Sequence, residues 1–566
     1  MSVQSHGAAS ALCPSNPTPG NGPSALILSY ILHGHIPYYV GGHHDSILDS
    51  KLSQRPCLLN LTPDLYAHFL SSLRYSTQAL PINTLLDTLI RPNADTEINP
   101  TSCIEWRYEP ARAVSHVAIG QTAQPGGQWA DNPVSASADI GTLSYAEQLS
   151  LPGYSYADHV AKSGKKGQCD FVRPSRTEVA EYMKAYPEAV GIADAVYTQL
   201  KAEDIYRSGN GFVVGSLGIR CKHLVLASGT FTVNIPPTPM LAPIAQLDNP
   251  QEPLLVIGSG FSAADVIISA PSTRKIIHIF QWTPDTRPSP LRGCHHTAYP
   301  EYATVYRQMK LAAISSLKST PARSPMQRRK SNPFFTQRDW PTSYEGLANA
   351  SIQSVSHADG AKTATITIRL ASGALVSRSV GALQHLIGRR GTLDFLSPDL
   401  RAEVLGPHVS PSTEPTLISG HTLRAKSESS LEVADNVFAI GSLAGDSLIR
   451  HAVGGCVFAA GRIMGVLPSG LSGTASEASV AASLASSSRS GSPGPGYDVS
   501  VASYDGGLLS SGLAGRELGT ANGHLDLHVD RRKLAQEVER ISAVNSAWVE
   551  SGWWGGGLGM GGGRGG

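Results

Sequence analysis

The stretch "PLLVIGSGFSAADVIISA", residues 253–270, decides the fold class of this chain. Its first part, Leu254 to Ile257, is a continuous apolar run, as expected for a parallel strand buried on both faces. The pattern G-x-G-x-x-A follows, in which the first glycine permits a tight turn and the second lets the backbone approach a pyrophosphate. A helix and a further strand, "RKIIHIFQW", complete a β-α-β unit. We therefore predict an α/β fold with a dinucleotide site formed by Gly258, Ser259, Gly260, Phe261 and Ser262.

The residues after that further strand indicate which dinucleotide binds. An acidic residue at the strand end would accept hydrogen bonds from a ribose 2′-hydroxyl and favour NAD. This chain has Gln281-Trp282-Thr283 there, and no acid before Asp285. Arginines lie nearby at Arg274, Arg287 and Arg292. They favour a 2′-phosphate pocket and NADPH, although they would equally suit ordinary loop charges.

A second match to the fingerprint lies near the N-terminus, in "NPTPGNGPSALILSYILHG", residues 16–34. Its contact residues would be Gly20, Asn21, Gly22, Pro23 and Ser24. The preceding strand should be central in its sheet, but Pro14, Pro17 and Pro19 occupy that place, and proline cannot donate to a central ladder. We therefore expect the first strand to be missing. Either the recorded N-terminus is wrong or FAD binding is impaired.

Three further segments suit a flavin site. Gly126-Gly127-Gln128-Trp129 combines a flexible turn with a flat indole that can cover a planar ring, although a core tryptophan after a loop would explain it equally well. The apolar run "HLVLASG", residues 223–229, ends in glycine. Late in the chain, "VFAIGSLAGD" places Gly441 and Asp446 after a strand, where a carboxylate can reach a ribose or ribityl hydroxyl.

In this order, the segments resemble the class B flavin monooxygenase plan, in which an NADPH domain interrupts an FAD domain. More closely, the chain resembles the oxidative stress-induced growth inhibitor family. The stretches that carry this resemblance are "GNGPSALILSYILHGHIPYY", "LLDTLIRPNAD", "HVAIGQTAQPGGQW", "RPSRTEVAEYMKAY", "YPEYATVYRQM", "LIGRRGTLDFL" and "VFAIGSLAGDSLIRHAVGG".

The resemblance implies an FAD-dependent, NADPH-consuming monooxygenase linked to growth and division control. FAD would be held by the first fingerprint, by Gly126 to Trp129 and by Gly441 and Asp446; NADPH would be held by the second fingerprint. A C4a-(hydro)peroxyflavin formed with O₂ would oxygenate a small-molecule substrate or a protein side chain, and no catalytic side chain is assigned. The alternative is a regulatory or scaffold protein that keeps the flavoprotein fold without the chemistry.

Other residues of the sequence are weaker candidates for a functional site. Cys294-His295-His296 and His43-His44 lack spaced partners, so we expect no metal site. The absence of C-x-x-C argues against a disulfide reductase. Arg389-Arg390 could contact a phosphate or be loop charges. The segment Tyr299 to Tyr302 could line a substrate pocket, although a packed aromatic turn explains it better.

Composition limits the remaining function classes. The net charge of +1 over 566 residues argues against a nucleic-acid partner. The 7 scattered cysteines indicate free thiols, and neither a secretory signal nor a membrane span is evident, so we expect a cytoplasmic protein.

The domain organisation follows the motifs. We expect a disordered segment at 1–19, an FAD-binding domain at 20–235 and 386–466, and the NADPH-binding domain at 236–385. The Ser/Gly-rich tail, 467–566, should be disordered except for an amphipathic helix near 529–549, which could bind a protein partner.

Overall fold

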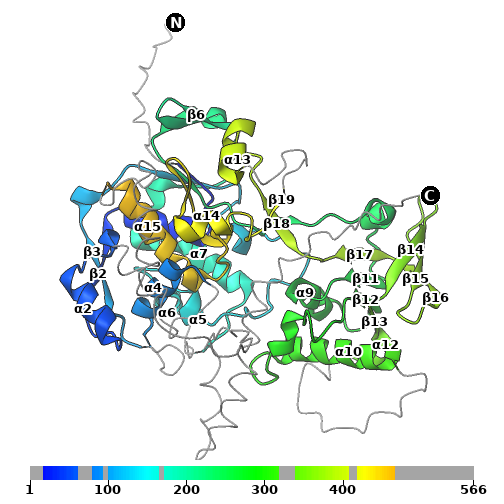
Figure 1. Cartoon of the computed structure of the whole chain (residues 1–566). Coiled ribbons are helices and arrows are strands. Elements are labelled where there is room, and N and C mark those ends of the chain that lie inside the picture. The colour runs from blue at the N-terminus through cyan, green and yellow to red at the C-terminus, as the bar shows by residue number, and fades with distance from the viewer. Residues whose placement is uncertain are drawn as a thin grey trace, which may run out of the picture.

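The computed structural model describes residues 17–61, 79–92, 100–164, 171–317, 338–406 and 417–465. Within these ranges the chain forms two lobes of mixed helix and strand, joined near β18 and β19 (Figure 1). The α/β class expected from the sequence is confirmed. The tail helix expected near 529–549 lies outside the described residues, as does Pro14.

The first lobe is built on short parallel strands. β1 pairs with β4 and β4 with β5, while β9 pairs in parallel with β21. β1 also lies beside β9, which brings the two groups of strands together. α1 and α15 pack on one another over this sheet, and every residue of α1 from Ala25 to Leu32 is buried. These elements are β1 (Pro17–Pro19), α1 (Pro23–Leu32), β4 (Val117–Ile119), β5 (Val196–Tyr197), β9 (Leu224–Leu226), β21 (Val437–Ala439) and α15 (Val453–Ile463).

The expectation that Pro17 and Pro19 cannot belong to the first strand is wrong, because they begin and end β1. The backbone N–H of Gly20 donates to Ile119 O of β4 at 2.7 Å. Since successive residues of a strand point their N–H groups to opposite sides, the proline nitrogens face away from β4, toward β9. No ladder joins β1 to β9 among the described residues, so the missing proline donors break no pairing.

The second lobe contains a parallel sheet of four strands in the order β13-β12-β11-β17. α9 follows β11, and α10 packs on both α9 and β13. The antiparallel meander β14-β15-β16 shares a second apolar cluster with β11 and β12. The elements are β11 (Leu254–Ile257), α9 (Phe261–Ser269), β12 (Ile276–Phe280), α10 (Pro300–Leu317), β13 (Tyr344–Ala348), β14 (Ser351–Ser356), β15 (Ala364–Arg369), β16 (Leu375–Val380) and β17 (Ala382–His385).

Two features connect the lobes. The crossing segments β10 (Val233–Asn234) and β18 (Arg389–Thr392) pair antiparallel. Arg173 of the first lobe donates to the carboxylate of Glu301, at the start of α10, at 2.6 Å, and to Ala298 O at 2.6 Å. Its guanidinium also lies 4.4 Å from the ring centre of Tyr299. Because Arg173 also donates to Thr142 O and Gly141 O, this contact ties the start of α10 to the loop that Arg173 anchors.

The remaining helices and strands surround these sheets. None of the described helices is long and apolar enough to span a bilayer. They are β2 (His35–Tyr39), α2 (Ser46–Gln54), α4 (Pro81–Ile90), β3 (Ile104–Tyr108), α5 (Ala146–Leu149), α6 (Tyr156–Lys162), α7 (Arg176–Val190), β6 (Ile205–Ser208), β7 (Gly211–Val214), β8 (Ile219–Cys221), α8 (Ala242–Ala245), α12 (Trp340–Ser343), α13 (Pro398–Leu405), β19 (Leu417–Ile418), α14 (Arg424–Ser429) and β20 (Glu432–Ala434).

Candidate functional site

The first fingerprint forms a tight turn between β1 and α1. Gly20 has a φ of +127°, and a Cβ there would lie 2.4 Å from Ala227 O of the neighbouring segment. Gly22 is the N-cap residue of α1, whose N-terminus receives no side-chain cap. An uncapped helix start presents backbone N–H groups and the positive end of the helix dipole, which together suit a phosphate.

The glycine turn at 126–129 lies directly on this fingerprint. The N–H of Gly126 donates to Asn21 O at 2.9 Å. Gly127 faces Gly22 so closely that a Cβ would stand 3.1 Å from the Gly22 Cα, and its φ is +55°. Only glycine suits this approach. The next two residues, Gln128 and Trp129, line a large cavity on the side of the second lobe.

The late glycine turn reaches the same place from the other end of the chain. A Cβ on Gly441, whose φ is +65°, would come within 2.3 Å of Ser24 Oγ. The structure therefore brings the first fingerprint, the turn at 126–129 and Gly441 together around the start of α1.

Asp446, by contrast, is engaged by the protein itself. One carboxylate oxygen accepts from the N–H of Leu80 at 2.8 Å and from Asn83 Nδ2 at 2.6 Å. The other oxygen accepts from Arg424 at 2.9 Å. Asp446 thus holds the start of α4 against the late turn, and the geometry leaves it no free oxygen to offer a ribityl chain in the way the sequence suggested.

We expect Asp446→Asn to lower the free energy of unfolding by about 1–2 kcal/mol, because it removes a negative charge from a helix start. Flavin content should not change. Urea unfolding and the absorbance of the purified variant measure the two effects. Asp435→Asn, at an exposed position, is the matched control for losing one carboxylate. If Asp446→Asn loses flavin while its free energy of unfolding is unchanged, Asp446 contacts the cofactor and this prediction is wrong.

Two buried polar atoms near the first fingerprint, Asn21 Nδ2 and Ser228 Oγ, have no hydrogen-bond partner among the described residues. Asn21 Oδ1 is satisfied by the Thr122 hydroxyl at 3.1 Å, so only the amide donor is left over. A buried polar group without a partner costs about 1–3 kcal/mol. Unused donors beside glycine turns and an uncapped helix suit a polar, phosphate-bearing group, so the residues present fit FAD.

The second fingerprint opens onto a cavity of about 770 Å³. Gly258 has a φ of +148°, and a Cβ there would lie 2.3 Å from Leu386 O. Gly260 precedes α9, which also starts without a side-chain cap, and no atom of the described residues lies within 4 Å of where a Gly260 Cβ would stand. This open approach to a helix start fits the pyrophosphate of a second dinucleotide.

The structure separates the three arginines considered for the 2′-phosphate. Arg287 lines the cavity together with Gln281 and Thr283. Arg274 instead donates to Asn249 O at 2.9 Å and to Glu252 O at 3.1 Å, outside the cavity lining. Arg292 donates to Pro284 O at 3.2 Å. Only Arg287 of the three is placed to meet a ligand in this cavity.

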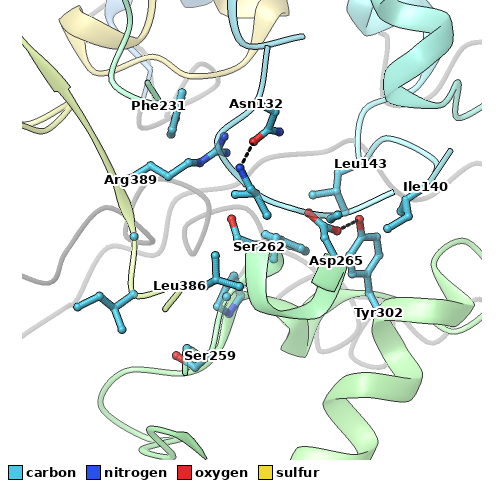
Figure 2. A pocket seen from close by; sticks show the side chains of 18 of the residues that line it. Asn132, Ile140, Leu143, Phe231, Ser259, Ser262, Asp265, Tyr302, Leu386 and Arg389 are labelled. Carbon is cyan, nitrogen blue, oxygen red and sulfur yellow. Dashed lines mark hydrogen bonds between the residues drawn. The ribbon is translucent and has the colours of Figure 1, made fainter. Parts of the chain in front are cut away.

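The far part of the cavity contains three charged groups, of which only Arg389 was considered from the sequence as a possible phosphate contact. Asp265 of α9 accepts from the Tyr302 hydroxyl at 2.7 Å, and burial raises the pKa of this carboxyl to about 6 (Figure 2). Arg389 lies beside the Phe231 ring, 4.7 Å from its centre, and donates to Gln128 Oε1 at 3.3 Å. Burial lowers the pKa of Arg389 to about 10. Arg176 lines the same cavity.

Of the aromatic residues around Pro300, Tyr302 lines the cavity and Tyr299 packs beneath it, with its hydroxyl donating to Leu143 O at 2.9 Å. The structure therefore gives the two tyrosines different places, Tyr302 on the cavity wall and Tyr299 in the packed turn. Asp265 was missed because one acid in an apolar helix carries no local signal. Among the described residues, no group of three or more His, Cys, Asp or Glu side chains could hold a metal ion.

Comparison with solved structures finds weak likenesses to flavoproteins. A flavin monooxygenase from Stenotrophomonas maltophilia aligns with a TM-score of 0.42 and 12% identity over 80% of this chain and 98% of that one. A bacillithiol disulfide reductase from Staphylococcus aureus aligns with a TM-score of 0.41 and 10% identity over 80% and 99%. At these TM-scores neither bears on the chemistry of this chain.

The curated relatives are more specific, although no family model matches the chain. Mouse oxidative stress-induced growth inhibitor 1 is 27% identical over 494 residues, which cover 79% of this chain and 94% of the relative. Human oxidative stress-induced growth inhibitor 2 is 25% identical over 500 residues, 77% and 90% of the two chains. Over most of its length, the chain is therefore similar to members of the oxidative stress-induced growth inhibitor family.

Proposed function

We propose that this protein is an FAD-dependent, NADPH-consuming monooxygenase. One observation carries the proposal: the loop 126–129 contacts the first fingerprint through Gly126 and lines the cavity of the second through Gln128 and Trp129. Hydride transfer requires the nicotinamide and flavin rings to meet, and a loop shared by both nucleotide sites is where they would do so. In this proposal, 20–235 with 386–466 binds FAD and 236–385 binds NADPH.

The chain's own residues would bind, orient and shield the cofactors. Bound flavin supplies the redox chemistry, accepting a hydride from NADPH and activating O₂ to oxygenate a substrate. Asn21, Gly22 and the start of α1 would hold the FAD pyrophosphate, and Gly441 would close on the turn. Apolar side chains such as Ile140, Leu143 and Leu149 line the cavity and would exclude water from the reaction.

The test is the visible absorbance spectrum of the purified full-length chain. We expect a bound flavin band, bleached by NADPH without oxygen and restored by air. A colourless protein that takes up no added FAD would contradict the proposal and favour the second candidate, a regulatory or scaffold protein. That candidate is motivated by the shortness of β1, which has only 3 residues before the first fingerprint.

NADPH selectivity gives a sharper prediction. We expect Arg287→Ala to raise the KM for NADPH by about tenfold or more, the usual range for hydrogen bonds to a charged group, and to leave the KM for NADH unchanged. Steady-state consumption of the two nucleotides measures this. Arg274→Ala is the matched control, because Arg274 is committed to backbone carbonyls. Equal effects of the two variants would contradict the assignment.

Growth control and a cytoplasmic location complete the proposal. The first is supported by the names of the curated relatives, which are growth inhibitors.

A further inference from the structure

Two guanidinium groups that line the cavity lack an acidic partner among the described residues. Arg176 and Arg389 both line it, and among the described residues no carboxylate lies within ion-pair distance, 4.0 Å, of either. Arg389 makes one hydrogen bond, to Gln128 Oε1 at 3.3 Å, although its side chain offers five N–H donors. A largely buried cation is costly unless it is paired, so the missing partner points to a ligand.

The two arginines come from segments of the chain that are far apart in sequence. Arg176 is the first residue of α7, and Arg389 begins the crossing strand β18. Each is close enough to Asp265 for its charge to affect that carboxyl. Asp265 is already bonded by Tyr302, as Figure 2 shows, and one carboxylate cannot neutralise two guanidinium groups. This end of the cavity therefore carries excess positive charge.

The surrounding wall is apolar. Ile140 and Leu143 lie on the Tyr302 side in Figure 2, and the Phe231 ring lies beside Arg389. Leu149 and Ile449 also line this cavity. A ligand complementary to both features has an apolar body and an anionic oxygen group.

We propose that Arg176 and Arg389 bind the carboxylate of an apolar organic acid, which is the substrate class of this site. The inference rests on the proposed function in taking the second fingerprint as the NADPH site. The same guanidinium groups could instead meet the NADPH pyrophosphate. The uncapped start of α9 and Gly260 already form a site for the pyrophosphate. Arg176 and Arg389 are therefore available to bind a second anion.

The experiment uses the full-length protein, with decanoate and decanol as probes of equal chain length, and calorimetry as the readout. We expect decanoate to bind more tightly than decanol. Arg389→Gln and Arg176→Gln should each weaken decanoate binding about tenfold or more and leave decanol unchanged. Arg389→Lys keeps the charge but loses the planar guanidinium, so it should weaken decanoate binding less than Arg389→Gln does. Exposed Arg369→Gln controls for loss of one positive charge.

Unchanged decanoate binding in both glutamine variants would overturn the inference. So would variants that weaken NADPH binding and leave decanoate binding intact, since the arginines would then belong to the cofactor. A circular dichroism spectrum identical to that of the parent protein confirms that each variant is folded; if Arg389→Gln is not, Arg176→Gln and Arg389→Lys decide. Decanoate binding needs no flavin turnover. A colourless protein that still binds decanoate more tightly than decanol would therefore contradict the proposed function and leave the carboxylate site supported.

Discussion

Gly20→Ala should lower the free energy of unfolding by about 3–5 kcal/mol, the range of the most damaging single substitutions. Gly20 has a φ of +127°, and the new Cβ would stand 2.4 Å from Ala227 O, a backbone atom that cannot rotate away. The substitution must push β1 away from β9 or distort the turn before α1. Bound flavin should fall with stability, because the same turn forms the proposed FAD site. Urea unfolding and flavin absorbance measure both losses.

Gly41→Ala is the matched control for this prediction. Gly41 also has a positive φ, +93°, but no atom lies within 4 Å of its added Cβ. It should cost only the backbone strain, about 1–2 kcal/mol. If the two variants lose equal stability, the close packing of Gly20 on the Ala227 segment is not what requires glycine there.

Two buried histidines should together contribute about 4 kcal/mol of destabilisation when the pH falls from 7 to 5. Burial lowers the pKa of both His116 and His278 from the ordinary 6.5 to about 4. Between pH 6.5 and pH 4, the two histidines are protonated in the unfolded chain but neutral in the folded chain. Their contribution to the free energy of unfolding is therefore fully present above pH 6.5 and falls as the pH drops toward 4. Each residue contributes about 2 kcal/mol of the loss at pH 5.

The hydrogen bonds of both rings explain why the neutral form is required. In His116, one ring nitrogen lies 2.7 Å from Val114 O and must donate, so the other accepts from the Ser29 hydroxyl at 2.8 Å. His278 likewise donates to Gly258 O at 2.6 Å and accepts from the Tyr344 hydroxyl at 2.8 Å. A second proton would leave a buried charge and turn the acceptor into a donor.

Urea unfolding at a series of pH values tests the histidine prediction. His116→Gln should reduce the loss between pH 7 and pH 5 by about 2 kcal/mol, whatever its own cost at pH 7. Exposed His296→Gln should leave the pH dependence as it is. An unchanged pH dependence in His116→Gln would show that this histidine is not the source.

How far the sequence predicts the structure depends on the range of the interactions. The strand, turn and helix from Leu254 to Ser269 follow the local pattern, because buried strands and glycine turns need only neighbouring residues. The exclusion of Pro17 and Pro19 failed although the principle was sound. The neighbouring strands decide on which side of a strand the N–H groups must donate. Among the described residues, β1 pairs only with β4, and the proline nitrogens lie on the other side.

By itself, the sequence determined the α/β class and the resemblance to the oxidative stress-induced growth inhibitor family, since both rest on patterns read along the chain. Only the tertiary structure decided which side chains face the cavity. Asp446 meets Asn83 across 363 residues, and the cavity collects Arg176, Asp265 and Arg389 from separate segments of the chain. Burial and charge at such sites depend on how distant segments pack, and residue order alone does not contain that geometry.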